Sequence, residues 1–563
     1  MKQLIECVPN FSEGRDPAVI KQITDAVERV EGVKLLDVDP GKATNRTVVT
    51  FVGEPGPVVE AAFQAIRLAA ELIDMRRHTG EHPRMGATDV CPLIPVSNIS
   101  MEETAGWARR LGERVGCELD IPVYLYEAAA SRPERRNLAA IRAGEYEALP
   151  EKLTRPEWAP DFGPARFHAK CGATVIGARD FLIAYNLNLN TTSTRRANSV
   201  AFDVREIGRV IADPTSGKPV VGPDGEPQRQ PGTLKGVKAI GWFIEEYGIA
   251  QISMNITDTR ATPLYRAFEE CCKSAERRGM RVTGSELVGL VPLDVLLEAG
   301  RYFLKKQQRS AGVSTAELIR IAVKSMGLDE LAPFDSRQKI IEYNLAKDDP
   351  ATAKKLIRKD LEAFADETAA ESPAPGGGSV SAYVGALGVS LATMVANLSA
   401  HKRGWDERWE AFSDAAEQGQ RLKDALLRTV DEDTDAFNAI LTAFGLPKGT
   451  PEEKAARKAA IEQATLGAIE VPLRVLRLGL ECLPLIRQMV DTGNPNSITD
   501  AGVGALCARA AVLGAALNVK VNASGLNDKD YAARVLAEAD AAMAEAGRLE
   551  SEILAVVREK MGV

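Results

Sequence analysis

The sequence predicts an α/β region followed by an all-α helical domain, and three observations support this fold class. Up to about residue 344, short runs rich in β-branched residues alternate with amphipathic helical patterns. Beyond about residue 345, Ala, Glu, Lys, Arg and Leu dominate and strand patterns disappear. The chain of 563 residues is also too long for a single hydrophobic core, so we expect several domains.

The first part of the chain alternates most clearly between strands and helices. Pro17 stands near the start of one predicted helix, and Ser100 with Glu103 forms a capping box at the start of another. The predicted strands lie at 4–9, 33–38, 47–52, 88–96 and 123–126, and the predicted helices include 17–30 and 58–75.

The pattern restarts after about residue 172. A Pro/Gly-rich insertion at 213–232 predicts a surface loop or a long hairpin. An Asp-Asp-Pro break within 346–350 predicts the hinge before the helical domain. The predicted strands lie at 181–189, 237–243 and 249–256, with a turn at 245–248.

Composition argues against several functional classes. The net charge is -8 and no Lys/Arg run is present, whereas nucleic-acid binding requires a basic surface. The eight cysteines lack CxxC or metal-ligand spacing, so we expect reduced thiols, no bound metal and a cytoplasmic location. The start of the chain lacks the apolar segment of a signal peptide. The uncharged stretch 379–400 is rich in Gly, Ala and Ser, and we expect it inside a soluble bundle rather than across a membrane.

A loop with two histidines is the first candidate for catalysis. It runs from His78 to Gly86, between a predicted helix and a predicted strand, and it contains His82. Histidine titrates near neutral pH and therefore suits general acid–base catalysis. The spacing is not HExxH, which argues against a zinc site. The alternative is a solvated surface loop without a catalytic role.

A second candidate loop, 161–172, is interpreted as the connection between the two α/β halves. It combines aromatic side chains, cations and glycines, and ligand sites favour domain interfaces. The alternative is a connector without a binding function.

Two further loops allow both a binding and a structural interpretation. Residues 373–379 place three consecutive glycines before the uncharged helix, where backbone N–H groups can converge on an anion, and the alternative is a flexible linker. Residues 491–500 are polar and turn-rich and precede another nearly uncharged helix, so ligand binding and helix capping are both open.

The helical domain places one carboxylate on an apolar helix face. Helical spacing puts Asp433 on this face, while Asp431 and Asp435 are predicted to point towards solvent. Desolvation there would raise the pKa of Asp433 towards a range useful for acid–base catalysis. The alternative is a buried ion pair with a structural role. The apolar stripe comprises Leu422, Leu426, Val430, Phe437, Ile440 and Phe444.

Motifs in both regions resemble the formimidoyltransferase-cyclodeaminase family. The resemblance spans nearly the whole chain in order, and its long motifs are specific. There are two departures: the 213–232 insertion is longer than in vertebrate-type chains, and residues 167–171 differ in their side chains. The resemblance rests on residues 6–14, 36–39, 45–47, 77–86, 140–150, 158–164, 287–293, 375–379 and 430–433.

The resemblance implies a domain organisation and an assembly. It implies a transferase half made of two related α+β sandwich subdomains, 1–180 and 181–344, then a linker at 345–353. An all-helical cyclodeaminase domain at 354–563 would complete the chain. The resemblance also implies a homo-oligomer, an octamer arranged as a tetramer of dimers.

The resemblance further implies the activity. The formimino group of N-formimino-L-glutamate would pass to tetrahydrofolate, and 5-formimidoyltetrahydrofolate would then cyclise to 5,10-methenyltetrahydrofolate with release of ammonia, as in histidine degradation. The tetrahydrofolate co-substrate would carry a polyglutamate tail.

The resemblance assigns roles to particular residues. His82 matches the acid–base residue of the transferase, and Asp433 matches that of the cyclodeaminase. The implied folate-binding segment comprises Gly163, Pro164, Ala165, Arg166, Phe167, His168, Ala169, Lys170, Cys171 and Gly172.

Three alternatives remain open from the sequence. The helical half could be an assembly module, or it could act as a methenyltetrahydrofolate cyclohydrolase. The whole chain could also bind folate as a scaffold without turnover. The presence of Asp433 counts against the assembly module, and the presence of His82 counts against the scaffold.

Overall fold

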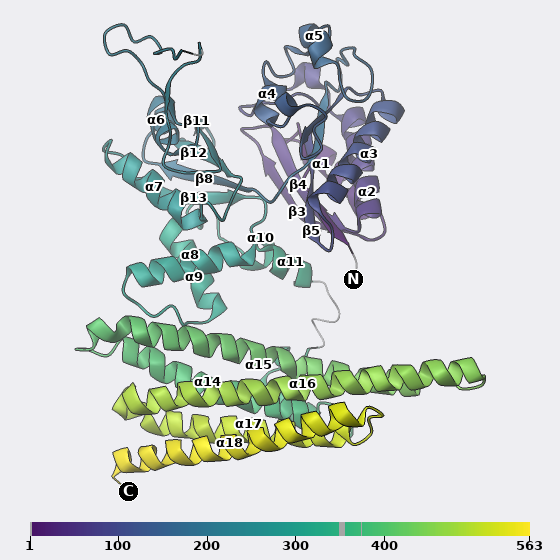
Figure 1. Ribbon diagram of the computed structural model, residues 1–563. Helices are drawn as coiled ribbons and strands as arrows, with labels where there is room; N and C mark the ends of the chain where they lie inside the picture. Colours follow the sequence, from purple (N-terminus) through teal and green to yellow (C-terminus); the bar gives the residue numbers. More distant parts are fainter. Residues whose placement is uncertain (1–2, 224, 348–354, 373, 563) are drawn as a thin grey trace. The chain divides into compact units, whose positions relative to one another are not determined.

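The computed structural model describes residues 3–223, 225–347, 355–372 and 374–562. In this part of the chain, strands end at residue 288 and long helices follow, as the sequence predicts (Figure 1). The first compact unit comprises residues up to 299 and 322–347, and the second comprises 300–321 and the residues from 348 onward. The predicted linker falls mainly on residues outside the described ranges, and the predicted domain boundaries remain predictions.

Seven strands form the first sheet of the first unit. Their order is β1–β4–β2–β5–β7–β6, and β3 pairs with β4 outside that path. Strands β1 to β5 pair antiparallel, whereas β5 with β7 and β7 with β6 pair parallel. The strands are β1 (Leu4–Cys7), β2 (Asn10–Phe11), β3 (Val33–Gly41), β4 (Arg46–Gly53), β5 (Thr88–Ser97), β6 (Val123–Glu127) and β7 (Thr174–Ala178).

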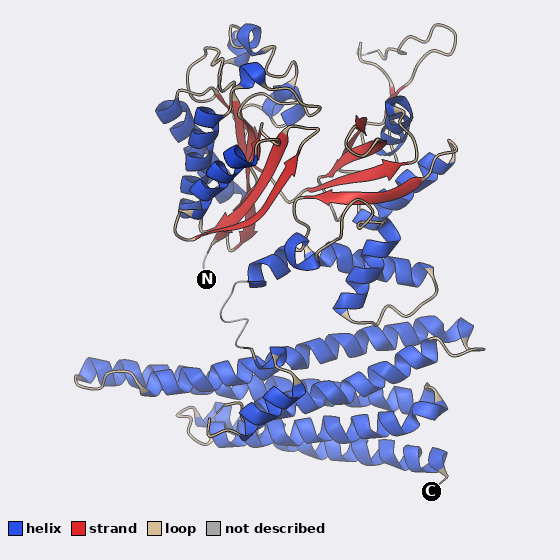
Figure 2. Ribbon diagram, turned by 180° about the vertical axis from the view of Figure 1, so that it is seen from behind, coloured by secondary structure: helices blue, strands red, loops and turns tan. Residues whose placement is uncertain are grey.

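Helices α1 (Pro17–Glu28), α2 (Pro55–Leu72) and α3 (Met101–Leu119) cover one face of this sheet (Figure 2). The predicted capping box of Ser100 and Glu103 is present at the start of α3. The other face is partly covered by short helices between β5 and β7. These are α4 (Leu138–Arg142), α5 (Leu149–Lys152), η2 (Pro133–Arg135) and η3 (Pro156–Trp158), and η1 (Met75–Arg77) precedes β5.

Strand alternation decides which side chains face the helices. Ile5 and Cys7 on β1 lie in the core beneath them, as do Val49 and Phe51 on β4. Successive side chains of a strand point to opposite faces. The intervening side chains, such as Glu6, therefore belong to the face that the long helices leave free.

The second sheet of the first unit has four antiparallel strands in the order β11–β12–β8–β13. The predicted turn at 245–248 joins β11 to β12. The 213–232 insertion forms a long hairpin whose base is the pair β9 (Arg209–Val210) and β10 (Arg229–Gln230). The sheet contains β8 (Ile183–Leu189), β11 (Val237–Ile244), β12 (Ile249–Ile256) and β13 (Val282–Val288), with helices α6 (Thr194–Val204) and α7 (Leu264–Glu276) on its outer face. Helices α8 (Leu293–Lys306), α9 (Thr315–Met326), α10 (Ser336–Lys339) and α11 (Ile341–Lys347) follow.

Five long helices pack side by side in the second unit (Figure 1). Helices α14 and α17 approach closely because glycines face one another. A Cβ atom added at Gly388 would lie 2.9 Å from the carbonyl oxygen of Gly504. The helices are α14 (Gly377–Ala400), α15 (Trp409–Phe444), α16 (Pro451–Thr492), α17 (Ile498–Ala523) and α18 (Lys529–Met561), with the shorter η4 (Leu356–Arg358), α13 (Leu361–Ala369), η5 (Asp406–Arg408) and η6 (Pro495–Ser497).

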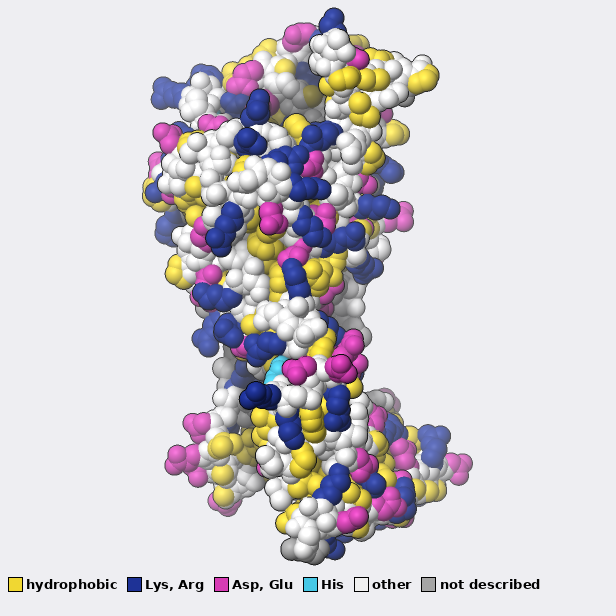
Figure 3. Space-filling model, turned by 90° about the vertical axis from the view of Figure 1, so that its left-hand side faces the viewer, with side chains coloured by type: hydrophobic (Ala, Val, Ile, Leu, Met, Phe, Trp, Pro, Cys, Tyr) yellow, Lys and Arg dark blue, Asp and Glu magenta, His cyan; other side chains and the backbone are white. Residues whose placement is uncertain are grey.

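Two apolar segments, α14 and Pro495–Ala523, have the length and hydropathy of a membrane span. In the most apolar 18-residue stretch of each segment, 61% (α14) and 50% (Pro495–Ala523) is buried within the second unit. Buried core helices of a soluble bundle commonly have this length and hydropathy. The two segments are therefore only weak evidence for a membrane-spanning helix. On the face shown in Figure 3, basic and acidic side chains are interspersed rather than separated by sign.

Candidate active sites

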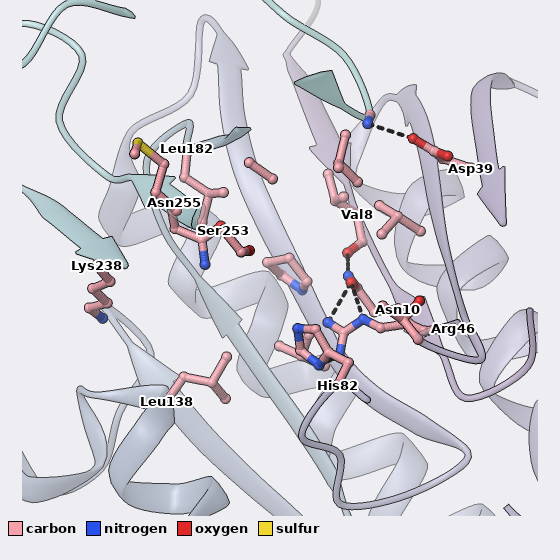
Figure 4. Close-up of a pocket in the computed structure, with 18 of the residues that line it drawn as sticks. Val8, Asn10, Asp39, Arg46, His82, Leu138, Leu182, Lys238, Ser253 and Asn255 are labelled. Carbon is pink, nitrogen blue, oxygen red and sulfur yellow. Dashed lines mark hydrogen bonds between the residues drawn. The ribbon is translucent and has the colours of Figure 1, made fainter. Parts of the chain in front are cut away.

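A cleft of about 950 Å³ lies in the first unit, between the sheet faces that the long helices leave free. One wall comes from β1, β4 and β5, and the other comes from β8, β11, β12 and β13. Figure 4 shows the opposing side chains: Asn10, Arg46 and His82 on one side, and Lys238, Ser253 and Asn255 on the other.

His82 lines this cleft and contacts a buried ion pair. Its Nδ1 lies 2.8 Å from Nη1 of Arg46, and the same Nη1 donates to Oδ2 of Asp89 at 2.7 Å. Arg46 also donates from Nε and Nη2 to Oδ1 of Asn10, at 2.9 and 2.5 Å (Figure 4). The orientation of Arg46 is thus fixed on two sides by acceptors.

Asp89 is 0% exposed and is shared by two arginines. Arg142, at the end of α4, donates to it from Nη2 at 2.5 Å and from Nε at 3.2 Å. The backbone N–H of Met85 donates to it at 3.0 Å. Despite complete burial, which alone would raise it, the pKa of Asp89 is lowered by Arg142 and Arg46. Asp89 is therefore ionised and holds both cations beside His82.

The imidazole of His82 is neutral at physiological pH. Desolvation lowers its pKa to about 3, and the positive charges of Arg46 and Arg142 act in the same direction. Nδ1 lies 2.7 Å from the carbonyl oxygen of Pro83 as well as 2.8 Å from Arg46. A neutral ring cannot donate to the carbonyl and accept from the guanidinium with the same nitrogen, so these contacts correspond to alternative tautomers.

The opposite wall of the cleft contains a polar network. Gln251 is fully buried and donates to Oδ1 of Asn188 at 2.8 Å and to Oε1 of Glu286 at 3.0 Å. It accepts from the indole N–H of Trp242 at 3.0 Å, and the Trp242 ring lies edge-on to His82 with centroids 6.5 Å apart.

One carboxyl group in the cleft is poised near neutral pH. Glu6 is only 4% exposed, and desolvation raises its pKa to about 7, partly offset by the positive charge of Arg179. The cleft therefore contains, besides His82, a carboxyl group whose pKa lies near neutral pH.

In the second unit, Asp433 lies against the first turn of α14. The hydroxyl of Ser379 donates to its Oδ2 at 3.0 Å, and the Ser379 backbone N–H also hydrogen-bonds to this carboxyl group. The N-cap residue of α14 is Gly376, which has no side chain to cap the helix, so Asp433 from α15 takes that place. A Cβ at position 378 would lie 2.2 Å from Oδ1 of Asp433, so Gly378 makes this approach possible.

The electrostatics of Asp433 fit a proton carrier better than an ion pair. Desolvation raises its pKa, and the two Ser379 hydrogen bonds only partly offset this effect. Among the described residues, no Lys, Arg or His forms an ion pair with it. The alternative of a structural ion pair therefore does not fit the described surroundings.

The prediction that Asp431 points into solvent is wrong. Its Oδ1 accepts the backbone N–H of Leu356 in η4 at 2.6 Å, and its Oδ2 is buried. Helical geometry alone does not reveal that a segment preceding the helix covers this side. The prediction for Asp435 is confirmed, because that side chain is exposed. The apolar stripe is buried at Leu422, Leu426 and Val430, whereas Phe444 at its end is 53% exposed.

Comparisons with known proteins cover both units. Residues 4–179 match the model "Formiminotransferase domain, N-terminal subdomain", residues 184–346 match "Formiminotransferase domain", and residues 360–541 match "Formiminotransferase-cyclodeaminase". The formimidoyltransferase-cyclodeaminase of Rattus norvegicus is 44% identical over 528 residues, which cover 94% of each chain. The chain belongs to the formimidoyltransferase-cyclodeaminase family.

Each half of this family member also has relatives of its own. The glutamate formimidoyltransferase of Thermoplasma acidophilum is 47% identical over 304 residues, 54% of this chain and 92% of that one. The methenyltetrahydrofolate cyclohydrolase of Methylorubrum extorquens is 41% identical over 201 residues, 36% of this chain and 97% of that one.

The segment that the family resemblance assigns to folate lies outside the cleft lining. Residues 163–172 precede β7 within the first sheet, so their interpretation as the connection between the two halves is wrong. Two of their glycines have structural roles. A Cβ at Gly163 would lie 2.3 Å from the carbonyl of Ile121, and one at Gly172 would lie 2.1 Å from that of Met85. Folate binding by the segment remains a prediction.

The side chains of this segment make contacts of their own. The Phe167 ring packs on Tyr146 with centroids 5.3 Å apart, and Nδ1 of His168 accepts the backbone N–H of Cys171 at 3.2 Å. Arg166 pairs with Asp120, and Lys170 donates to the carbonyl of Glu71 at 2.5 Å. The exposed Ala165 and Ala169 and the partly buried Pro164 complete the segment.

The remaining sequence candidates have structural explanations. His78 is buried, with Nε2 2.8 Å from the carbonyl of Asn45 and with Nδ1 accepting from Arg84 at 3.2 Å. In the 491–500 loop, Asn494 caps η6 through the N–H of Asn496, which confirms the capping interpretation. Among the described residues, no three His, Cys, Asp or Glu side chains form a group that could hold a metal ion.

Sequence patterns missed the arginine pair and its carboxylate. An isolated Asp at position 89 within an otherwise apolar strand was a detectable signal, because such a charge needs a partner when buried. Arg142 gave no signal, since α4 is only five residues long and shows no periodicity. Asn186 and Asn188 were detectable as polar positions alternating with apolar ones along β8.

Proposed function

We propose that this protein transfers the formimino group of N-formimino-L-glutamate to tetrahydrofolate in the cleft and then cyclises the product at Asp433, releasing ammonia. The observation that carries the proposal is a neutral histidine, fixed beside two arginines, in a cleft large enough for both substrates. The named activities of relatives that match the whole chain and the first half alone support it.

In the first step, N5 of tetrahydrofolate attacks the formimino carbon of the donor. The tetrahedral intermediate must then expel glutamate, whose nitrogen leaves readily only when protonated. His82 accepts the N5 proton and returns it to the glutamate nitrogen, so no net proton is consumed. The tautomer that donates Nδ1–H to Pro83 leaves Nε2 free to accept that proton.

The low pKa of His82 favours the second half of this step, in which the protonated histidine gives its proton to the glutamate nitrogen. An imidazolium beside Arg46 and Arg142 is a strong acid and gives its proton readily to the departing nitrogen. The same low pKa makes His82 a weaker base when it accepts the N5 proton in the first half of the step. Bound substrate would strengthen this base if it neutralised part of the positive charge of Arg46 and Arg142.

In the second step, N10 of the folate attacks the same carbon, and the formimino nitrogen leaves as ammonia. That nitrogen already bears one hydrogen, gains the N10 proton and requires one further proton. Asp433, with its raised pKa and its neutral partners, is suited to carry a proton to the leaving nitrogen.

A second candidate function for the helical half is methenyltetrahydrofolate cyclohydrolase activity. The relative with that name matches almost its whole length to this part of the chain. In both activities a nucleophile attacks the one-carbon unit carried by the folate. In cyclodeamination the nucleophile is N10 and ammonia leaves, whereas in methenyl hydrolysis the nucleophile is water. Assaying the protein with 5-formimidoyltetrahydrofolate and with 5,10-methenyltetrahydrofolate, and following ammonia release and hydrolysis separately, distinguishes the two.

Three finer properties belong to the same proposal: a polyglutamate tail on the folate, a cytoplasmic location within histidine degradation, and a homo-oligomer. All eight cysteines are free thiols, which is usual in a reducing compartment.

The proposed homo-oligomer is an octamer built as a tetramer of dimers. Its assembly would bury apolar side chains that a single chain leaves exposed on the neighbouring helices α14 and α17. Large unpaired apolar faces are typical of interfaces. Sedimentation of the intact protein without detergent should therefore show an assembly, and a monomer at micromolar concentration would contradict it. The exposed residues are Leu387, Leu398, Val503, Leu517 and Val521, at 46–66%.

Replacing His82 by Ala should reduce formimino transfer by roughly 10²–10⁴-fold, the usual loss for an acid–base group. The variant should still cyclise supplied 5-formimidoyltetrahydrofolate, because Asp433 lies in the other unit. His78→Gln is the matched control, since that histidine lies in the same loop as His82 but outside the cleft lining. Near-normal transfer by His82→Ala would remove His82 from the mechanism.

Replacing Asp433 by Asn should leave transfer and folding intact but abolish most ammonia release, so that 5-formimidoyltetrahydrofolate accumulates. Asn retains an oxygen that accepts from Ser379 and removes the desolvated charge, so the melting temperature should not fall.

Asp435→Asn is the proper control for this experiment because Asp435 is an exposed neighbour on the same helix. Asp431→Asn is unsuitable, since Asp431 holds the backbone of η4 and its loss should lower stability. Full ammonia release by a well-folded Asp433→Asn protein would exclude Asp433 as the proton carrier.

A further inference from the structure

Arg142 lines the cleft, and two of its three guanidinium nitrogens are engaged by Asp89. Its Nε and Nη2 both donate to this carboxylate, and its side chain is 15% exposed. Among the described residues, none accepts a hydrogen bond from its Nη1. Arg46, by contrast, uses Nε, Nη1 and Nη2 on Asn10, Asp89 and His82.

The charges around this guanidinium do not balance. Two arginines share the single carboxylate of Asp89, and His82 is neutral, so the cluster bears a net positive charge. Two other carboxylates of the cleft have donors of their own: Glu286 accepts from Asn186 and Gln251, and Asp39 accepts the N–H of Gly289 at 2.9 Å. A partly buried guanidinium with an unpaired N–H edge and surplus charge is suited to an anionic ligand group.

The structure of the proposed donor, N-formimino-L-glutamate, places a carboxylate close to His82 and Arg142 during the reaction. In N-formimino-L-glutamate the formimino group is attached to the α-nitrogen, and the α-carboxylate is two bonds from that nitrogen. If His82 protonates this nitrogen, the α-carboxylate lies within a few ångströms of the site of proton transfer. The γ-carboxylate is two bonds further away and can reach other parts of the cleft.

We infer that Arg142 binds the α-carboxylate of the formimino donor through Nη1, while Asp89 holds the guanidinium in place. This inference rests on the proposed transferase function. Arg142 would thereby make the cleft selective for donors derived from an α-amino acid. Binding of the carboxylate also neutralises the surplus charge beside His82, which removes one of the causes that weaken this residue as a base.

Besides Arg46, three other cations line the cleft and are the rival candidates: Lys42, Arg179 and Lys238. Arg179 lies close enough to Glu6 to influence its pKa, and it donates from Nη1 to the carbonyl of Asp180 at 2.9 Å. Lys238 donates to the side chain of Asn137 at 3.4 Å. None of the three shares Asp89 with the arginine that contacts His82, so all are better placed for the γ-carboxylate or the folate.

Three donors separate the two carboxylates. N-formimino-L-glutamate has both, the N-formimino derivative of 4-aminobutyrate lacks the α-carboxylate, and that of L-2-aminobutyrate lacks the γ-carboxylate. Arg142→Gln should lower kcat/KM about 10²-fold for the first and third donors, mainly through KM, because a charged hydrogen-bond partner is lost. For the 4-aminobutyrate derivative the loss should be smaller by about 10-fold or more, because no α-carboxylate is present to be lost and only the effect of Arg142 on His82 remains.

Two further variants separate binding from structure. Arg142→Lys keeps a charge on Asp89 and should recover part of the loss. Arg84→Gln removes a comparably buried arginine that does not itself line the cleft and that pairs with Glu145 and Glu147. This variant should leave the ratio among the three donors unchanged. An equal loss on all donors, or a loss that spares the L-2-aminobutyrate derivative, would overturn the inference.

A binding measurement distinguishes failure of this inference from failure of the proposed function. In calorimetric titrations, the wild-type protein should bind the product L-glutamate more tightly than 4-aminobutyrate, and Arg142→Gln should lose that preference. If the wild-type protein shows no formimino transfer, the proposed function fails, and this titration still decides the role of Arg142. If both proteins have the same preference, the inference fails whatever the activity.

Discussion

The carboxylate of Asp89 organises the transferase cleft. It is completely buried, and an isolated charge in such a place costs several kcal/mol unless it is paired. Pairing brings together Arg46 from β4 and Arg142 from α4, two elements that are distant in the sequence. Removing one partner of such a buried pair typically costs about 3–5 kcal/mol, so this interaction fixes both the local fold and the position of His82.

The two proposed sites use burial in opposite ways. In the cleft, desolvation and two nearby cations lower the pKa of a histidine, so that its protonated form is a strong acid. In the helical unit, desolvation without a cationic partner raises the pKa of Asp433, so that a carboxyl group can retain a proton to donate. Both shifts move a group away from its ordinary value, which is common at sites that transfer protons.

Local periodicity made most of the fold predictable. The alternation along the strands and the position of Asp433 depend on repeats of two and 3.6 residues, and the capping box at Ser100 depends on a motif of four residues; a single sequence reveals all of these. The arginine pair was not predictable in this way, because it forms only when β4, α4 and β5 converge. Asp431 was misjudged for the same reason: its partner, Leu356, is 75 residues away and belongs to no repeat of α15.

The central claim is that desolvation, reinforced by the surplus positive charge anchored by Asp89, keeps His82 neutral. The most direct test is an NMR titration of the four histidine side chains of the intact protein, with the His82 resonance identified by its loss in His82→Ala. The account predicts a pKa for His82 far below the ordinary value of about 6.5, and a higher pKa in Arg142→Gln. A His82 resonance that titrates at or above pH 6.5 in the wild-type protein would contradict the account.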